Sequence, residues 1–294
     1  MEKYFITDLA LEKDESAKPY FEILTEHSIA YRNFSLPIDP HERADEPKTV
    51  TIHTKNLWEL SQNELIDLGN KTGEELARLM RAQLKGFEGI VPSVLVVGLG
   101  NREHTSDALG PETVKYLTVT RHLPKGASCG CMVSAVATGV TSQTGIETAE
   151  LVSGICRQIS PHLLLAVDSL AARSTCRLAS TIQLSDGGIL PGSGLGNLGK
   201  ALNRQTLKCP VISIGVPTVV HSVGVPTVVH SVTLIADAFR QCGIQSADEL
   251  LKKRLEDEQN RYVAPKESDL LLKSAALLLA LAIDHACALF GGEA

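Results

Sequence analysis

Two aspartates stand at positions where a carboxylate could do chemistry. Asp168 follows the apolar run LLLAV at 163–167, which is typical of a buried strand. A charged group at the carboxyl end of such a strand is costly unless it is paired or used. Asp107 lies in SDALGP at the expected start of a helix, where an N-cap and a functional role are equally open. Together they could form a carboxylate pair in which one group is protonated and the other orients water.

Several neighbouring segments could contribute to such a site. Arg173 follows in DSLAAR and could hold a carboxylate or a developing oxyanion, or form a surface ion pair. The glycine-rich segment 187–199 indicates close approach to a ligand or an extended peptide, or a flexible surface loop. GLGN at 98–101 invites a dinucleotide-binding interpretation, but Glu103 occupies the place of the third glycine and would repel a pyrophosphate. The sequence has no serine-hydrolase GxSxG in strand–turn–helix context, no HExxH zinc motif and no phosphate-binding GxxxxGK[ST].

The elements that would position these residues alternate along the chain. Short apolar runs predict strands at 94–97, 133–136, 163–167 and 211–214, with helices at 109–119, 146–159 and 231–241. This alternation predicts an α/β sheet with helices on both faces. Sites in such sheets form at the carboxyl ends of strands, which points to the loops 98–110, 137–145, 168–197 and 215–232.

The two ends of the chain have a different pattern. A strand is plausible at 49–53, and leucines among charges at 57–86 predict one or two amphipathic helices broken near 69–73. The Ala/Leu-rich segment 270–290 is interrupted by Lys273, Asp284 and His285, so we expect a buried helix and no membrane span. The charged N-terminus is unlike a signal peptide, and a cytoplasmic location is expected.

Composition excludes other classes. The 294 residues carry a net charge of -6, which argues against direct nucleic-acid binding because phosphate-backbone binders need clustered Lys and Arg. The seven cysteines include one C-x-C pair without a matching second pair, so we expect scattered thiols and no zinc site or other cofactor.

Many longer motifs, in one order, resemble the spore germination protease family. They are VVGLGN (96–101), DALGP (107–111), VTRHL (119–123), TGIET (144–148), DSLAAR (168–173), TIQLSDGGILPGSGLGN (181–197), PVISIGVPTVV (210–220) and VAPKESD (263–269). The resemblance implies an atypical aspartic endopeptidase that degrades small acid-soluble spore proteins during germination, in the cytoplasm of the spore core. It also implies a zymogen, a homotetramer, and a three-layer α/β/α fold with a mostly parallel sheet, similar to hydrogenase maturation proteases.

The same resemblance implies roles for particular residues. Asp107 in DALGP and Asp168 in DSLAAR match the acidic site residues. Beside the resemblance, Arg173, Asn101 and Arg121 are candidates for substrate or oxyanion contacts. An acidic residue before the scissile bond would need a cation to bind it, which Arg173 or Arg121 could supply. The sequence around Asp8 and Leu9 resembles the family's processing site. It precedes any expected packed element, so it should be mobile enough to be cut. The expected organisation is a propeptide at 1–8, an N-terminal extension at 9–90 packed on the core, and a catalytic domain at 91–294.

Departures from the family pattern leave alternatives open. His221-Ser222 and again His230-Ser231 replace the usual Asp-Ala, and Thr138 replaces a proline. These departures leave open a non-catalytic descendant of the fold. A metal-dependent maturation-type protease is a further alternative, because two carboxylates on such a fold can bind a divalent ion. GVPTVVHSV also occurs twice in tandem, at 215–223 and 224–232, and we expect only one copy to occupy the ancestral position.

Overall fold

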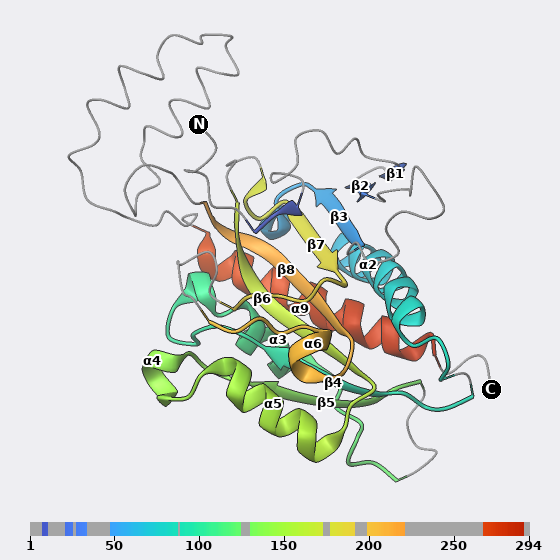
Figure 1. The fold of residues 1–294 in the computed structure, drawn as a ribbon. Coiled ribbons are helices and arrows are strands. Elements are labelled where there is room, and N and C mark those ends of the chain that lie inside the picture. The colour runs from blue at the N-terminus through green and yellow to red at the C-terminus, as the bar shows by residue number, and fades with distance from the viewer. Residues whose placement is uncertain are drawn as a thin grey trace, which may run out of the picture.

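One mixed sheet of eight strands organises the protein (Figure 1). Its order is β1-β2-β3-β7-β8-β6-β4-β5. The strands are β1 (Phe21–Thr25), β2 (Ser28–Asn33), β3 (Thr49–Thr54), β4 (Ser93–Gly98), β5 (Met132–Ala137), β6 (Leu163–Ala172), β7 (Thr181–Ser185) and β8 (Val211–Val220). The four strands expected from the apolar runs correspond to β4, β5, β6 and β8, and the strand at 49–53 corresponds to β3.

The helices of this computed structural model are α2 (Gln62–Gln83), α3 (Leu109–Tyr116), α4 (Thr141–Thr144), α5 (Thr148–Ile159), α6 (Arg204–Leu207) and α9 (Ser268–Ala288), with 3-10 turns η1 (Leu57–Glu59) and η2 (Thr105–Asp107). The structure describes residues 8–10, 21–25, 28–33, 48–87, 89–124, 130–172, 177–191, 199–220 and 267–290. The helix expected at 231–241 and the second copy of the tandem repeat lie outside these residues.

The direction of the strands divides the sheet into two halves. Pairings among β8, β6, β4 and β5 are parallel, and those from β1 through β2, β3 and β7 to β8 are antiparallel. The sheet is therefore mixed, and the expected parallel arrangement holds for the half that carries Asp168. The antiparallel half is formed by β1, β2 and β3 from the N-terminal region together with β7. Only residues 26 and 27 separate β1 from β2, which is too short for the crossover that parallel pairing needs.

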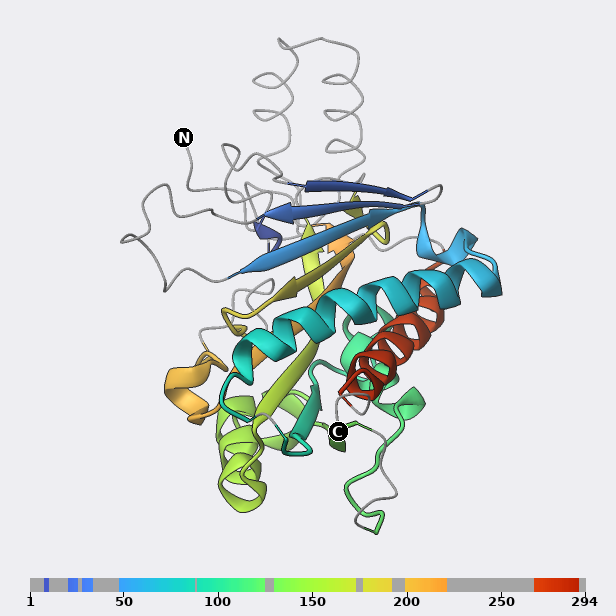
Figure 2. The same ribbon diagram turned by 90° about the vertical axis from the view of Figure 1, so that its right-hand side faces the viewer.

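Helices α2 and α9 lie side by side over one face of the sheet (Figure 2). Contrary to the expected break near 69–73, α2 is one unbroken helix. Its two glycines permit close packing instead. A Cβ added to Gly73 would lie 2.7 Å from the carbonyl oxygen of Ala282, and one added to Gly69 would lie 3.2 Å from the Cβ of Leu281. The two glycines that predicted a break in the helix instead allow α2 and α9 to pack closely together.

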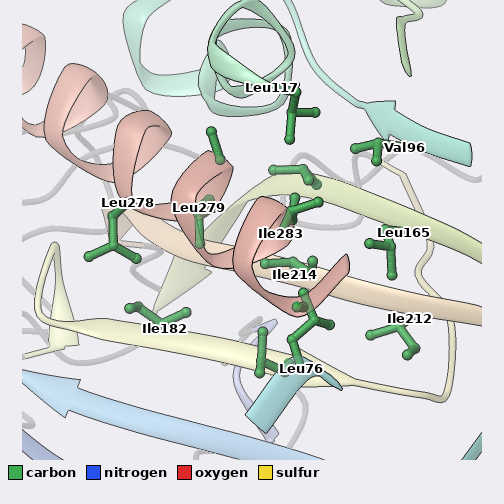
Figure 3. Packing of buried hydrophobic residues seen from close by; sticks show 14 of the residues in the cluster. Leu76, Val96, Leu117, Leu165, Ile182, Ile212, Ile214, Leu278, Leu279 and Ile283 are labelled. Carbon is green, nitrogen blue, oxygen red and sulfur yellow. The ribbon is translucent and has the colours of Figure 1, made fainter. Parts of the chain in front are cut away.

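The core on this face joins the helices to alternate strand residues, as Figure 3 shows. Ile283 of α9 and Leu76 of α2 pack with Val96, Leu165 and Ile214, all at most 1% exposed. By length and composition α9 could cross a membrane, but 56% of its apolar window is buried inside the protein. It is the core helix expected from the sequence.

A second core fills the opposite face of the parallel half. Leu95, Val97 and Leu164 alternate with the residues of the first core and pack against Val152 of α5 and Leu207 of α6. The sheet is thus covered by helices on both sides, which confirms the three-layer α/β/α arrangement. Asp168 belongs to the face covered by α5, because it continues the alternation of Leu164.

Candidate active site

Asp168 lies at the point where β6 loses one of its two neighbours. Pairing of β4 with β6 ends at Val167, whereas pairing with β8 continues through Asp168 opposite Gly215. The strand does not end at Asp168, as the sequence indicated, but continues to Ala172. The side chain is 6% exposed, and its Oδ1 accepts a hydrogen bond of 2.8 Å from the backbone N–H of Ser169. Asp168 is therefore a buried carboxyl group at the position where β6 is no longer paired with β4.

Asp107 is held by the loop that follows β4. The backbone N–H of Leu99 donates to the carbonyl oxygen of Val167 at 2.8 Å, which ties the start of this loop to β6. Asp107 Oδ2 then accepts a 2.8 Å hydrogen bond from the backbone N–H of Asn101. The N-cap interpretation of Asp107 is wrong: the N-cap of α3 is Ala108, and it makes no side-chain cap bond. The carboxylate stabilises its own loop instead.

Gly100 makes this folded loop possible. Its φ is +106°, a conformation that glycine adopts without strain. A Cβ at this position would lie 2.0 Å from the carbonyl oxygen of Asp107 and 3.0 Å from its Oδ1. The glycine that suggested nucleotide binding therefore serves to let the Asp107 loop close on itself.

Both aspartates line one cavity of about 540 Å³. Its wall is formed by the loops after β4 and β5, the start of α5 and the loop before α6. The lining residues are Leu99, Gly100, Asp107, Gly139, Val140, Thr141, Ser142, Glu147, Thr148, Ala149, Asp168, Pro191, Gly199 and Lys200. The structure thus brings together the two carboxylates that the sequence singled out.

The cavity changes the acidity of both groups. Burial raises the pKa of Asp168 well above its usual value, and the negative charge of Asp107 raises it further. Burial also raises the pKa of Asp107, against the opposing hydrogen bond from Asn101. Two neighbouring carboxyl groups of this kind favour a state in which one holds a proton and the other is ionised. Such a pair can act as general acid and general base in one site.

The other predicted contact residues have different positions. Asn101 is 8% exposed, and its Oδ1 accepts hydrogen bonds from the N–H of Glu103 at 2.9 Å and from Gln143 Nε2 at 2.7 Å. It therefore connects the Asp107 loop to the loop after β5. The N–H of Arg121 donates to the carbonyl oxygen of Val133, near the beginning of β5. That places Arg121 at the opposite end of the parallel strands from Asp168. Arg173 lies outside the described residues.

Sequence reasoning missed a cation and its partner on the cavity wall. Lys200 Nζ lies 3.7 Å from Glu147 Oε2, and the Lys200 backbone N–H donates to Glu147 Oε1 at 2.7 Å. This pair joins the start of α5 to the end of the glycine-rich segment. Glu147 lies in the motif TGIET, and Lys200 follows the last glycine of the segment 187–199. These positions in two expected site loops could have pointed to the pair.

The segment at Asp8 and Leu9 is packed, contrary to the expectation that it precedes any packed element. The N–H of Asp8 donates to the carbonyl oxygen of Ala171 at 2.9 Å, and Leu9 is fully buried against Leu170 and Ala172. The charge of Asp8 also raises the pKa of Asp168. The candidate processing site therefore lies on the strand that carries Asp168.

Comparison with known proteins identifies the family. The model of the germination protease family matches residues 45–242, which include both aspartates and the whole cavity wall. The chain belongs to the germination protease family. The germination protease of Caldanaerobacter subterraneus subsp. tengcongensis is 38% identical over 258 residues, covering 81% of this chain and 77% of that protein.

Other germination proteases have a higher sequence identity to this chain over a shorter part of it. That of Bacillus subtilis is 53% identical and that of Priestia megaterium 50% identical, each over 133 residues that cover 44% of this chain and 36% of the relative. Among solved structures, the [NiFe] hydrogenase maturation protease HycI from Thermococcus kodakarensis KOD1 covers 67% of this chain and 98% of its own, with 16% identity and a TM-score of 0.32. That similarity is too low to support a statement on function.

One departure from the germination protease pattern can be located. Thr138 is 5% exposed directly after β5, and its N–H donates to the carbonyl oxygen of Gly98 at 3.1 Å. A proline has no N–H, so a proline at this position could not make this bond. His221 and His230 lie outside the described residues.

Proposed function

We propose that this chain is the endopeptidase that begins the degradation of small acid-soluble spore proteins during germination, in the cytoplasm of the spore core. Membership of the germination protease family supports a protease role in germination. The observation that carries the catalytic assignment is the single cavity in which Asp107 and Asp168 meet with raised pKa values.

The two aspartates divide the chemistry between them. Asp168, the more deeply buried, holds the proton and donates it to the carbonyl oxygen of the scissile peptide bond. Asp107, with its oxygen fixed by the N–H of Asn101, is ionised and removes a proton from the attacking water. When the tetrahedral intermediate collapses, Asp107 gives the proton that it took from water to the amide nitrogen, which leaves as an amine. Asp168 takes back a proton from a hydroxyl group of the intermediate, which becomes the new carboxylic acid, so the pair returns to its starting state. This is the acid–base division of a carboxyl pair that shares a proton.

The zymogen part of the proposal rests on the N-terminal segment. Asp8 and Leu9 lie against Leu170–Ala172 of β6, and the charge of Asp8 raises the pKa of Asp168 on the same strand. We propose that the chain cuts itself between Asp8 and Leu9 and that the mature enzyme is a homotetramer. Removal of residues 1–8 would then release the contacts of Asp8 with Ala171, so that a protein substrate can take its place.

The direct test is incubation of the purified chain with a small acid-soluble spore protein, followed by mass spectrometry of the fragments. The proposal requires discrete internal cuts that persist in the presence of a chelator. Loss of cleavage with chelator would favour the metal-dependent maturation-type protease. Absence of cleavage, with the spore protein still bound, would favour a non-catalytic descendant. Among the described residues, no group of three or more His, Cys, Asp or Glu side chains is placed to hold a metal ion.

A further inference from the structure

The segment Asp8–Ala10 is bound by its main chain between two strands. On one side, the N–H of Asp8 donates to the carbonyl oxygen of Ala171 at 2.9 Å, and Asp8 Oδ2 accepts from the N–H of Ala171 at 2.8 Å. On the other side lies the side chain of Gln183 from β7. The segment therefore makes contacts of the kind that a peptide makes in a binding groove.

Gln183 contacts the segment with both ends of its amide group. Its Oε1 accepts from the N–H of Ala10 at 2.8 Å, and its Nε2 donates to the carbonyl oxygen of Asp8 at 3.2 Å. A neighbouring β-strand offers a peptide the same pair of one acceptor and one donor around a single residue. Here that residue is Leu9. The Gln183 side chain thus makes the two hydrogen bonds that a neighbouring β-strand would make to the main chain of the segment.

The position of Gln183 relates it directly to the active site. Ile182 and Leu184 point into the α2–α9 core, so Gln183 points to the opposite face. The register places Asp168, Gly215 and Gln183 opposite one another on adjacent strands. Gly215 has no side chain, and the side chain of Leu170 covers it, since a Cβ added to Gly215 would lie 2.6 Å from Leu170 Cγ. Gln183 is 8% exposed with the segment in place.

The side chain of Leu9 fills a small apolar site. Leu9 is fully buried and clusters with Leu170 and Ala172, which follow Asp168 on the same strand. The site is formed by these apolar side chains, and the flanking contacts to Ala10 and the carbonyl oxygen of Asp8 are to main-chain atoms. An unrelated peptide with a large aliphatic residue could make these apolar and main-chain contacts in an extended conformation, although the bond from the N–H of Ala171 to Asp8 Oδ2 needs an acidic side chain.

We propose that Gln183, the main chain of Ala171 and the Leu170–Ala172 site form a substrate subsite, which selects an extended peptide with a large aliphatic side chain. This assignment rests on the proposed peptidase function. The chain's own N-terminal segment occupies the subsite, and a substrate peptide replaces it. Gln183 is a positioning residue that holds the substrate main chain beside Asp168, and it takes no part in the chemistry.

Hydrogen exchange in the full chain carrying Asp168→Asn tests binding without cleavage. The probe is a synthetic peptide, ITDLALE, with the chain's own sequence at 6–12. Increasing peptide concentration should raise the exchange of the Ala10 amide, because the peptide displaces the segment. A peptide with alanine in place of the leucine at position 9 should need at least a tenfold higher concentration, as should one whose residue-10 nitrogen is methylated. Equal potency of all three peptides, or no displacement by any, would overturn the subsite.

Two variants test Gln183 itself. Gln183→Met removes both polar atoms at similar volume and should speed exchange of the Ala10 amide about tenfold or more, as expected for the loss of its hydrogen bond. Gln205→Met, an exposed glutamine on α6, is the matched control and should change nothing. In the processed enzyme with Asp168 intact, Gln183→Met should raise KM for a spore protein about tenfold and leave kcat within about twofold. Unchanged exchange and unchanged KM would both contradict the assignment.

These outcomes separate the two proposals. If the peptides displace the segment as expected but the chain cuts no spore protein, the proposed function fails and the subsite stands. If the chain cuts spore proteins while no peptide alters the exchange of Ala10, the subsite fails and the proposed function stands.

Discussion

The negative charge of Asp107 raises the pKa of Asp168, although Asp107 ends the 3-10 turn η2 and Asp168 lies in strand β6. Their proximity depends on the 2.8 Å hydrogen bond between the N–H of Leu99 and the carbonyl oxygen of Val167, which joins the strand ends behind them. The pair is thus a property of the parallel half of the sheet, and its consequences can be tested residue by residue.

Asparagine at either position should abolish peptidase activity. Asp107→Asn cannot remove a proton from water, and Asp168→Asn cannot donate a carboxyl proton, so each should reduce kcat by about 10³-fold or more. Asp67→Asn on the exposed face of α2 is the matched control, because it removes only a surface ion pair with Lys71. Fragment formation from a spore protein measures the effect. Activity close to that of the parent in either site variant would refute the assignment.

The stability of the chain should depend on pH through Asp168. Its pKa in the folded protein is raised above the usual 3.8, so the folded state holds this proton more strongly than the unfolded state does. The contribution to stability is greatest below pH 3.8 and is lost as the pH rises through the raised pKa. Asp168→Asn removes this dependence and should be more stable than the parent at neutral pH by roughly 0.5–2 kcal/mol. Urea unfolding from pH 4 to 8 should show this difference growing with pH, and a constant difference would contradict the prediction.

Replacing Gly100 by alanine should disable the site through the Asp107 loop. The added Cβ would meet the Asp107 carbonyl oxygen at 2.0 Å, so the loop must shift and carry the carboxylate with it. We expect a loss of about 1–3 kcal/mol in stability and at least a tenfold loss of activity. Gly89→Ala, with φ +76° and nothing within 4 Å of the added Cβ, introduces the backbone strain without the collision. If both variants lose activity equally, the close approach to Asp107 is not what matters.

Self-processing should give a chain that begins at Leu9. Incubation under mildly acidic, dehydrating conditions followed by N-terminal sequencing detects this product. Asp168→Asn should remain uncut, because the same carboxyl pair performs the reaction. Processing that persists in this variant, or an active enzyme with an intact N-terminus, would argue against the zymogen.

Deleting residues 224–232 should leave the fold intact. The first copy of the tandem repeat supplies Gly215–Val220 of β8, where Gly215 pairs with Asp168. The second copy is not needed for these strand contacts, so the melting temperature should be equal or higher. Circular dichroism of the deletion variant measures this, and failure to fold would show that both copies are structural.

The strands of the parallel half were predictable because their burial is visible in short apolar runs, and the stretches between them predicted α3 and α5. The short helices α4 and α6 were not predicted. The antiparallel half was not, apart from β3, because β1 and β2 carry no such run and their place in the sheet depends on pairing with distant residues. The same limit explains α2. Gly69 and Gly73 indicated a break, and only the approach of α9 gives them another role.

The aspartate pair was predictable because each residue follows a recognisable strand or lies in a recognisable motif. Gln183 was not, since a glutamine inside a strand carries no local signal, and its contact with Ala10 joins opposite parts of the chain. Arg121 was chosen as a cation near a family motif. The register of β4 and β5 places it at the far end of the sheet, which sequence alone does not reveal.

The packing of α2 against α9 has a consequence for biosynthesis. The ribosome makes α2 long before α9, and at about 5–20 residues per second the interval is roughly 10–40 s. During that time Leu76 and Met80 of α2 lack the α9 residues that complete their core cluster. The emerging chain therefore exposes these apolar residues, and a chaperone that binds apolar segments is expected to associate with it until α9 appears.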